Sequence, residues 1–174
     1  MRHRANRPLT HAELPLACAG TFLAILAVAA PAAMLDLDSS ATLMLIGSFG
    51  STAILLFGQP HGVHSTGRAV LGGQVVSAVV GVTCQALVGT PLLGAAAAVT
   101  LALGLMHVTG TMHAPGGATA LLAVTGGPSV HALGFGYVLA PVALGVTLML
   151  AVRSAMARLA RRAAGADAPR TGAT

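Results

Sequence analysis

Two short stretches of this chain place glycine and hydroxyl side chains together inside apolar sequence. The first covers residues 47–52 and reads GSFGST, and the second covers residues 113–119 and reads HAPGGAT. Glycine lets a ligand approach the backbone closely. The start of a helix offers unpaired amide N–H groups and the positive end of the helix dipole. Two such helix starts facing each other would bind a small anion.

The candidate binding residues share either a hydroxyl, an imidazole or a bare backbone; they are Gly50, Ser51, Thr52, His113, Gly116, Gly117 and Thr119. The hydroxyls would donate to the anion, or instead bond back to their own helix carbonyls. Imidazole titrates near neutral pH, so His113 is a candidate gate or anion contact, with a structural hydrogen bond as the alternative. The glycines would shape the backbone or let helices pack closely.

Two further side chains are candidates for lining the route by which an anion would reach this site. Arg68 is the only basic residue between Leu14 and Val152. It would attract anions at the cytoplasmic mouth, or anchor the chain at the membrane surface. Gln74 lies about two helical turns further along and is expected to face the pathway.

Other chemistry finds little support in the residue types. His61 and His64 have the spacing of a metal-binding pair but lack carboxylate or cysteine partners, so no metal site is expected. A set of nucleophile, base and carboxylate is absent, so the chain is not expected to be an enzyme. We expect no cofactor.

The composition indicates a protein that lies almost wholly in the lipid bilayer. The chain has 174 residues, of which 55% are hydrophobic and 7% charged. Between Leu14 and Val152 the formal charges are Asp36, Asp38 and Arg68. A water-soluble globule has no means of covering its surface with so few charges. Aromatic stacking platforms are also missing, so nucleic acid is not an expected partner.

The apolar runs predict an all-α fold of about six short transmembrane segments. A spanning helix needs about 20 apolar residues. The runs cover residues 14–35, 41–57, 69–88, 92–108, 118–124 and 131–152. The fifth is too short to span alone and is read as part of a broken or re-entrant helix. A transmembrane domain over 14–152 therefore separates a basic N-terminus, 1–13, from a basic tail, 153–174.

Arginines gather at both ends of the chain, which predicts that both termini are cytoplasmic. That requires an even number of crossings, six or, if two segments only re-enter, four. Asp36 and Asp38 then lie outside and are expected to sit in a loop that caps a helix. The expected location is a bacterial inner membrane, and a chain this small is expected to form a homo-oligomer.

The two halves of the transmembrane domain resemble each other. The sequence from Gly50 to Leu56 aligns with Gly117 to Ala123, and Gly72 to Val82 aligns with Gly136 to Val146. Repeat one then covers about 14–88 and repeat two about 92–152. Three crossings in each repeat invert the second relative to the first, an arrangement that recurs in transporters. The two glycine-rich stretches would be the helix breaks that meet near the midplane.

The stretch around His113 resembles the HPP family of integral membrane proteins, named for a His-Pro-Pro motif. Here the motif reads His113-Ala114-Pro115, with Ala114 in place of the middle proline. A second family-like block runs from Phe49 through Arg68 to Gly73, and Gln74 stands where histidine is expected. The resemblance covers roughly residues 17–150. Relatives in plastids and cyanobacteria are associated with nitrite transport, so the resemblance implies transport of nitrite or a similar small anion.

We therefore expect a transporter or channel for a small inorganic anion, with protons as the candidate coupling ion. The alternative is a membrane sensor or scaffold subunit that transports nothing, in which the basic tail binds anionic lipid or a partner.

Overall fold

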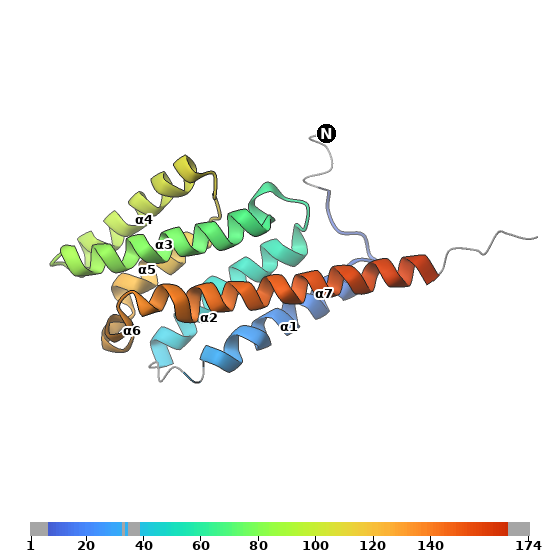
Figure 1. Ribbon diagram of the computed structural model, residues 1–174, viewed down its shortest axis with the longest axis horizontal. Coiled ribbons are helices and arrows are strands. Elements are labelled where there is room, and N and C mark those ends of the chain that lie inside the picture. Colours follow the sequence, from blue (N-terminus) through green and yellow to red (C-terminus); the bar gives the residue numbers. More distant parts are fainter. Residues whose placement is uncertain (1–6, 33, 35–38, 167–174) are drawn as a thin grey trace, which may run out of the picture.

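The chain forms a bundle of helices that lie side by side along one axis (Figure 1). The computed structural model describes residues 7–32, 34 and 39–166. The described residues contain helices, turns and loops but no strand. Three helical stretches are long and apolar enough to cross a membrane: Gly67–Leu87, Pro91–Thr109 and Val138–Arg162. Three shorter apolar helices accompany them, Leu14–Ala30, Leu45–Gly58 and Gly116–Thr125, so the all-α membrane fold is confirmed.

The helix boundaries follow the first five apolar runs to within a few residues. In chain order the elements are α1 (Leu14–Ala32), α2 (Ser39–Ala53), η2 (Ile54–Gly58), η3 (Val63–Ser65), α3 (Gly67–Leu87), α4 (Pro91–Thr109), α5 (Gly116–Thr125), α6 (Gly127–Leu133), η4 (Val138–Ala143) and α7 (Leu144–Ala166). Here η2 and η4 are π-helical and η3 is a 3-10 turn. The predicted loop and cap at Asp36 and Asp38 lie outside the described residues.

Successive apolar helices alternate in direction along the bundle. The start of α1 and the end of α7 both lie toward the right of Figure 1. Along the bundle axis, α1, α3 and α5 run in one direction, and α2, α4 and α7 run in the other (Figure 1). The halves also interlock, since α1 packs on α7, and α3 packs on both α4 and α5.

Local signals explain where several helices begin and end. Thr66 caps α3, and its Oγ1 accepts a hydrogen bond from the Ala69 amide at 3.2 Å. Gly110 ends α4 in the left-handed conformation at φ 64°, which glycine adopts at no steric cost. α5 ends at Thr125 because Gly126 follows, and the turn there is too tight for a side chain: a Cβ on Gly126 would lie 2.6 Å from the Leu122 carbonyl oxygen.

The start of α1 is held by a capping box between Thr10 and Glu13. The Thr10 amide and hydroxyl both donate to Glu13 Oε2 at 2.8 Å, and the Glu13 amide donates to Thr10 Oγ1 at 3.3 Å. Arg7 completes the group with an ion pair to Glu13 at 2.5 Å. Hydrogen bonds from Thr10, and then the nearby Arg7 charge, hold the pKa of the Glu13 carboxyl below its usual range.

One predicted helix break is wrong. The stretch from Gly47 to Thr52 lies inside α2, which continues unbroken to Ala53. A Cβ on either Gly47 or Gly50 would meet nothing within 4 Å, so these glycines do not mark a close approach. In an apolar medium the backbone keeps its own helical hydrogen bonds unless something else replaces them. The irregular backbone comes after Thr52, in η2.

The predicted start of the sixth segment is also displaced. His131 belongs to the short helix α6, and its Nε2 lies 2.9 Å from the Val124 carbonyl oxygen. The long final helix begins after the turn at Gly134, with η4 leading into α7. Hydropathy alone does not separate α6 from α7 because both are apolar, and the turn between them is set by Gly134 at φ 49°.

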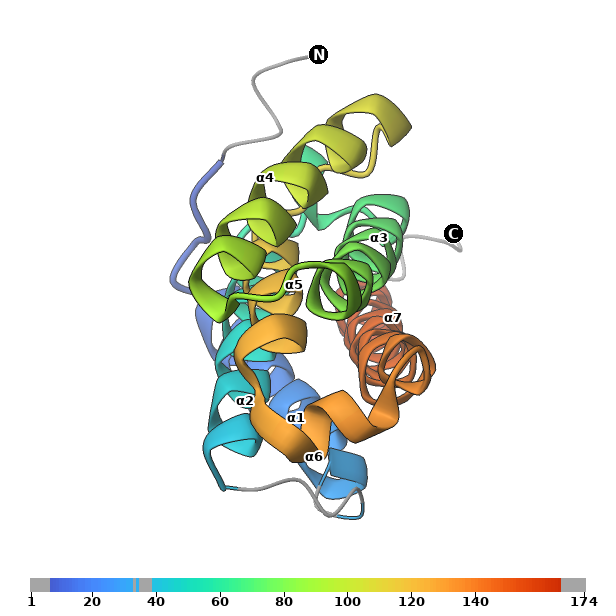
Figure 2. The same ribbon diagram turned by 90° about the vertical axis from the view of Figure 1, so that its left-hand side faces the viewer.

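Helix α3 approaches its neighbours closely at glycine residues. Figure 2 shows α5 beside α3 and α4. At Gly81 of α3 an added Cβ would lie 2.6 Å from the Ala120 carbonyl oxygen and 2.7 Å from the Ala123 Cβ. The hydrophobic effect contributes little to the association of helices in lipid, so such close packing stabilises the pair through van der Waals contact.

Replacing Gly81 with alanine should therefore loosen the bundle. The added methyl group meets backbone of α5 that has no rotamer to escape into, so we expect a loss of about 1–3 kcal/mol in unfolding free energy. The measurement is unfolding of the pure protein in mixed micelles by added SDS.

The matched control is Gly104→Ala in α4, where a Cβ would meet nothing within 4 Å. That change should be neutral or stabilise by about 0.5–1 kcal/mol, because alanine favours the helix. Equal losses for the two variants would contradict the packing role of Gly81.

The capping box should make the start of α1 sensitive to acid. Because the folded pKa of Glu13 is depressed, its contribution is fully present above the ordinary carboxyl range and is lost as the pH falls through the folded pKa. The amide proton resonance of Thr10, measured by NMR in micelles, should titrate with a midpoint below about 4.3, the usual glutamate value. Glu13→Gln should remove this titration, and a midpoint at or above the usual value would refute the box.

Candidate functional site

Polar side chains from both halves of the chain meet in the centre of the bundle. Ser48 and Thr52 come from α2, Gln74 from α3, His113 from the loop before α5, and Thr119 from α5. All are buried, with exposed fractions of 0% for Thr52, Gln74 and His113 and 2% for Ser48 and Thr119. We call this group the polar chain.

The members of the polar chain form a continuous series of hydrogen bonds. His113 Nε2 lies 3.1 Å from Thr52 Oγ1, and Gln74 Nε2 donates to the same oxygen at 2.9 Å. The other end of the Gln74 amide, Oε1, accepts a hydrogen bond from Thr119 Oγ1. Ser48 Oγ then lies 2.8 Å from Thr119 Oγ1. Gln74 is thus the link between the two threonines that the sequence pairs across the repeat.

A pair of backbone contacts sets the orientation of the His113 ring. His113 Nδ1 lies 2.9 Å from the His64 carbonyl oxygen. A carbonyl oxygen only accepts, so Nδ1 carries a proton. The His64 ring returns the contact, since its Nδ1 lies 2.9 Å from the Met112 carbonyl oxygen. Nε2 of His113 is therefore the nitrogen that faces the polar chain.

Two hydroxyls in the polar chain each have one proton and two acceptors. Thr52 Oγ1 lies 3.1 Å from both the Ser48 carbonyl oxygen and His113 Nε2. When His113 is neutral, Nε2 accepts a hydrogen bond from the Thr52 hydroxyl. When Nε2 is protonated it donates to Thr52, whose own proton then turns to the Ser48 carbonyl. Ser48 has a similar choice between Thr119 Oγ1 and the Pro115 carbonyl oxygen, at 2.8 and 3.2 Å.

Of the predicted glycines, Gly116 is the one that the packing requires. A Cβ on Gly116 would lie 2.6 Å from Ser77 Oγ and 3.0 Å from the Gly73 carbonyl oxygen. Gly73 is equally tight, with a Cβ position 2.7 Å from the Cβ of His113. These approaches bring the loop before α5 onto α3. Gly117 is only half-buried, and the nearest atom to its Cβ position is 3.8 Å away.

The predicted helix starts do not face each other, because only α5 begins near the polar chain. Its first amides also have local partners: Gly116, Gly117 and Ala118 donate to carbonyls of residues 113–115 at 2.9–3.1 Å. Thr52 lies in the last turn of α2 instead. The site is therefore formed by side chains from four segments, not by two opposed dipoles.

Ser51 and Gly50 do not join the polar chain. Ser51 is exposed, and its hydroxyl bonds back to the Ser48 carbonyl at 2.9 Å, as the structural alternative predicted. Gly50 is half-buried with open space at its Cβ position. Gly50 lies on the side of α2 opposite Ser48, and Ser51 is turned about 100° away from Thr52 around the helix.

Three contributors escaped the sequence analysis: Ser48, Tyr137 and His64. Ser48 lies in the quoted glycine-rich stretch, one turn before Thr52, so helical spacing was a usable signal. Tyr137 donates its hydroxyl to the Thr119 carbonyl at 3.1 Å and is buried. Its signal was a lone tyrosine in apolar sequence, a position where a buried hydroxyl needs a partner. The backbone contact from His64 has no sequence signal.

At the end of the bundle where α1 begins and α7 ends, an open cleft reaches His64. The cleft has a volume of about 740 Å³, and its lining includes Arg7, Gln59 and His64. The His64 carbonyl oxygen is the one that holds His113. The cleft therefore approaches one end of the polar chain.

Two arginines tie loops together at the same end. Arg153 of α7 is half-buried and donates to the carbonyls of Ser65 and Pro60, to the latter at 2.5 Å. Arg68 is exposed and donates to the Thr109 carbonyl at 2.9 Å, across from the end of α4. Arg68 thus lies at the surface, and its recorded contact is structural.

The described residues leave no buried side-chain nitrogen or oxygen without a hydrogen-bond partner. They also contain no group of three or more His, Cys, Asp or Glu side chains placed to hold a metal ion. The polar chain is hence a complete network of neutral donors and acceptors, with one imidazole as its titratable member.

Comparison with known proteins places the chain among membrane proteins. The family model described as "HPP, transmembrane region" matches residues 6–164. Two Dictyostelium discoideum proteins, both described as transmembrane proteins, are 39% identical over 125 residues and 37% identical over 123 residues. These matches cover 70% and 68% of this chain but 40% and 43% of the relatives, so the chain spans about two fifths of their length. No solved structure matches.

Gln74 should be the most costly member of the polar chain to remove. Gln74→Leu removes the amide that joins Thr52 to Thr119. The two threonine hydroxyls then each lose a hydrogen-bond partner in an apolar interior. We expect a loss of about 1–3 kcal/mol in unfolding free energy, measured by SDS titration in mixed micelles.

Gln85→Leu is the control, because Gln85 lies on the same helix α3, is half-buried and is outside the polar chain. We expect its effect to stay within about 0.5 kcal/mol. A loss for Gln85→Leu as large as that for Gln74→Leu would mean that the polar chain contributes nothing specific.

Proposed function

This chain belongs to the HPP family of membrane proteins, and we propose that it conducts a small inorganic anion, nitrite first among the candidates, along the polar chain. The observation that carries the proposal is the buried polar chain itself, which joins side chains of both halves inside a membrane bundle. Polar groups at membrane depth are costly, so their presence in a connected line favours a pathway over a packing accident.

The chemistry of the polar chain suits an anion better than a cation. Hydroxyl, amide and imidazole groups donate hydrogen bonds, and sequence positions 14–152 carry no carboxylate except Asp36 and Asp38, which lie outside the described residues. A small anion that entered the polar chain would accept hydrogen bonds from Thr52, Thr119 and Gln74 in place of their present partners. Nitrite, with two oxygens, matches a pair of hydroxyls on opposite sides of one amide.

His113 gives the pathway a means of sensing protons. Protonation at Nε2 would add one positive charge beside Thr52 and turn the Thr52 hydroxyl toward Ser48. An anion next to that charge would be stabilised, and its departure would favour loss of the proton. Proton-coupled entry is therefore the form of transport that the contacts favour, with a simple channel as the other form.

The remaining expectations form part of the same proposal. The basic ends of the chain favour a cytoplasmic location for both termini, which puts the cleft at His64 on the cytoplasmic side. The membrane would be the inner membrane of a bacterium, and the protein would act as a homo-oligomer without chemical conversion of the anion.

A sensor or scaffold role is the second candidate, and one observation favours it. Every buried polar side-chain atom of the described residues already has a partner. Such a network needs no ligand to be stable, and a purely structural lock between the two halves would look the same. Transport measurements on the polar chain separate the two functions.

The test is nitrite entry into proteoliposomes, followed by a reporter inside, with and without a pH gradient. Wild-type protein should exceed empty liposomes, and an inside-alkaline gradient should raise the rate if protons enter with the anion. Thr52→Val and Thr119→Val should each lower the rate at least tenfold, because each removes one donor and one link of the polar chain. Gly116→Ala should act in the same direction by pushing the loop off α3.

Thr125→Val is the matched control. Thr125 lies on the same helix as Thr119, but its hydroxyl bonds back to the Leu121 carbonyl at 3.0 Å on the exposed face. Its transport should equal that of the wild type. If all three threonine variants and the wild type matched empty liposomes for nitrite, nitrate, formate and chloride, the scaffold function would replace transport.

A further inference from the structure

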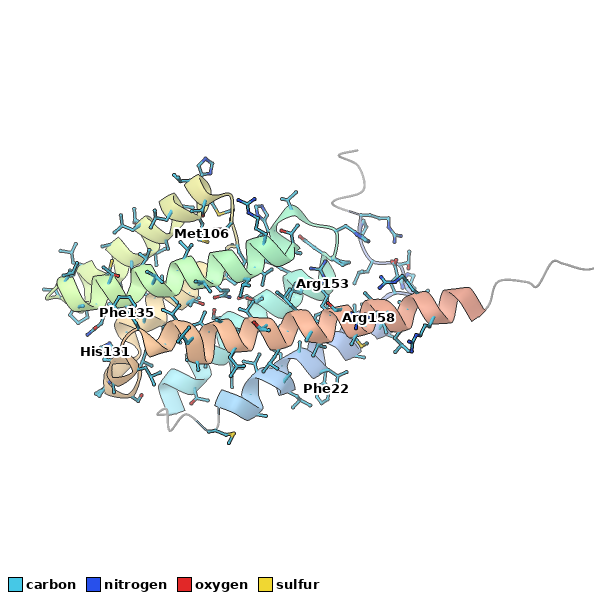
Figure 3. All side chains as sticks on the ribbon, viewed as in Figure 1. Phe22, Met106, His131, Phe135, Arg153 and Arg158 are labelled. Carbon is cyan, nitrogen blue, oxygen red and sulfur yellow. The ribbon has the colours of Figure 1, made fainter. Side chains whose placement is uncertain are left out.

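A second polar feature lies away from the polar chain, against the outer part of α7. It is a cleft of about 510 Å³ whose lining includes Arg153, Arg158 and Arg161 of α7. Its other wall is Gly67, the first residue of α3, and its inner end is the apolar side chain of Leu150. Figure 3 shows Arg153 and Arg158 following one another along α7.

The charge in this cleft is not balanced by acidic groups of the described residues. The ion pair found among them joins Arg7 and Glu13, at the start of α1. Arg153 donates hydrogen bonds to two backbone carbonyls, which carry no net charge, so no carboxylate of the described residues neutralises its positive charge there. Gly67 adds the positive end of the 21-residue helix α3. The cleft therefore attracts an anion.

The depth of the cleft points to a lipid and not to a solute. A membrane crossing takes about 20 helical residues, which counted from Val138 ends near Ala157. Leu150 then lies at the depth of the acyl chains, whereas Arg158 and Arg161 lie at the level of the phosphates. A free phosphate ion would use the basic part of the cleft and leave the apolar part unfilled.

We propose that this cleft binds the headgroup of an anionic phospholipid, with Arg158 and Arg161 holding the phosphate and an acyl chain lying along Leu150. Arginine suits the phosphate because its planar guanidinium donates two parallel hydrogen bonds. The bound lipid would bridge α7 and the start of α3. The site is independent of the proposed anion pathway and is tested without any transport measurement.

The experiment is a titration of the pure protein in neutral detergent with dioleoyl phosphatidylglycerol or dioleoyl phosphatidylcholine, followed by native mass spectrometry. Wild-type protein should bind the anionic lipid about tenfold more tightly or better. Arg161→Gln should weaken that binding about fivefold, and Arg158→Gln/Arg161→Gln more strongly, since each basic residue near an anionic headgroup contributes about that factor. Binding of the zwitterionic lipid should stay unchanged.

Arg162→Gln is the matched control, because Arg162 is the next residue on α7, is exposed and does not line the cleft. It removes the same charge and should leave the affinity for phosphatidylglycerol unchanged. Equal weakening by Arg162→Gln would show only a diffuse attraction and overturn the proposal. So would equal affinity for the two lipids, or full displacement of phosphatidylglycerol by millimolar inorganic phosphate, which would assign the cleft to a free ion.

Discussion

The structure depends on one constraint, which is that a polar group inside an apolar bundle must find its partner within the protein. In water an unmatched hydroxyl or amide turns to solvent, but at membrane depth each such group left alone costs several kcal/mol. Ser48, Thr52, Gln74, His113 and Thr119 meet this constraint together, and none of them meets it through its own helix alone. The network therefore specifies how four segments must be placed.

Close backbone packing is what allows those side chains to reach each other. Helix α3 carries Gln74 toward α2 on one side and approaches α5 on the other, and bare glycine surfaces make the second approach possible. At Gly73 and Gly116 the backbone of α3 and the loop before α5 come within the space that a single methyl group would fill. The short α5 is positioned by this contact more than by its own length, because helices of ten residues gain little stability in isolation.

The same network that stabilises the fold also has room to rearrange. Thr52 and Ser48 each hold one proton between two acceptors, so protonation of His113 would turn the Thr52 hydroxyl toward the Ser48 carbonyl without moving a helix. The backbone carbonyl that holds His113 belongs to His64, in a loop that Arg153 grips from α7. Helix α7 is in this way connected to the centre of the bundle by hydrogen bonds to main-chain carbonyls.

By itself the sequence determined the membrane class, the positions of the first five apolar helices to within a few residues, and Thr52, Gln74, His113, Gly116 and Thr119 as residues of interest, because hydropathy, hydroxyl placement and a family motif are properties of local sequence. Tertiary structure alone decided that Thr52 ends a helix instead of starting one, and that Ser51 and Gly50 lie outside the polar chain. It also decided that Gln74 links two threonines far apart in the sequence and that Tyr137 and His64 support them. The reason is physical. Which hydroxyl faces inward depends on how each helix is rotated in the bundle, and a backbone carbonyl is present in every residue, so residue type does not reveal which carbonyl will accept a hydrogen bond.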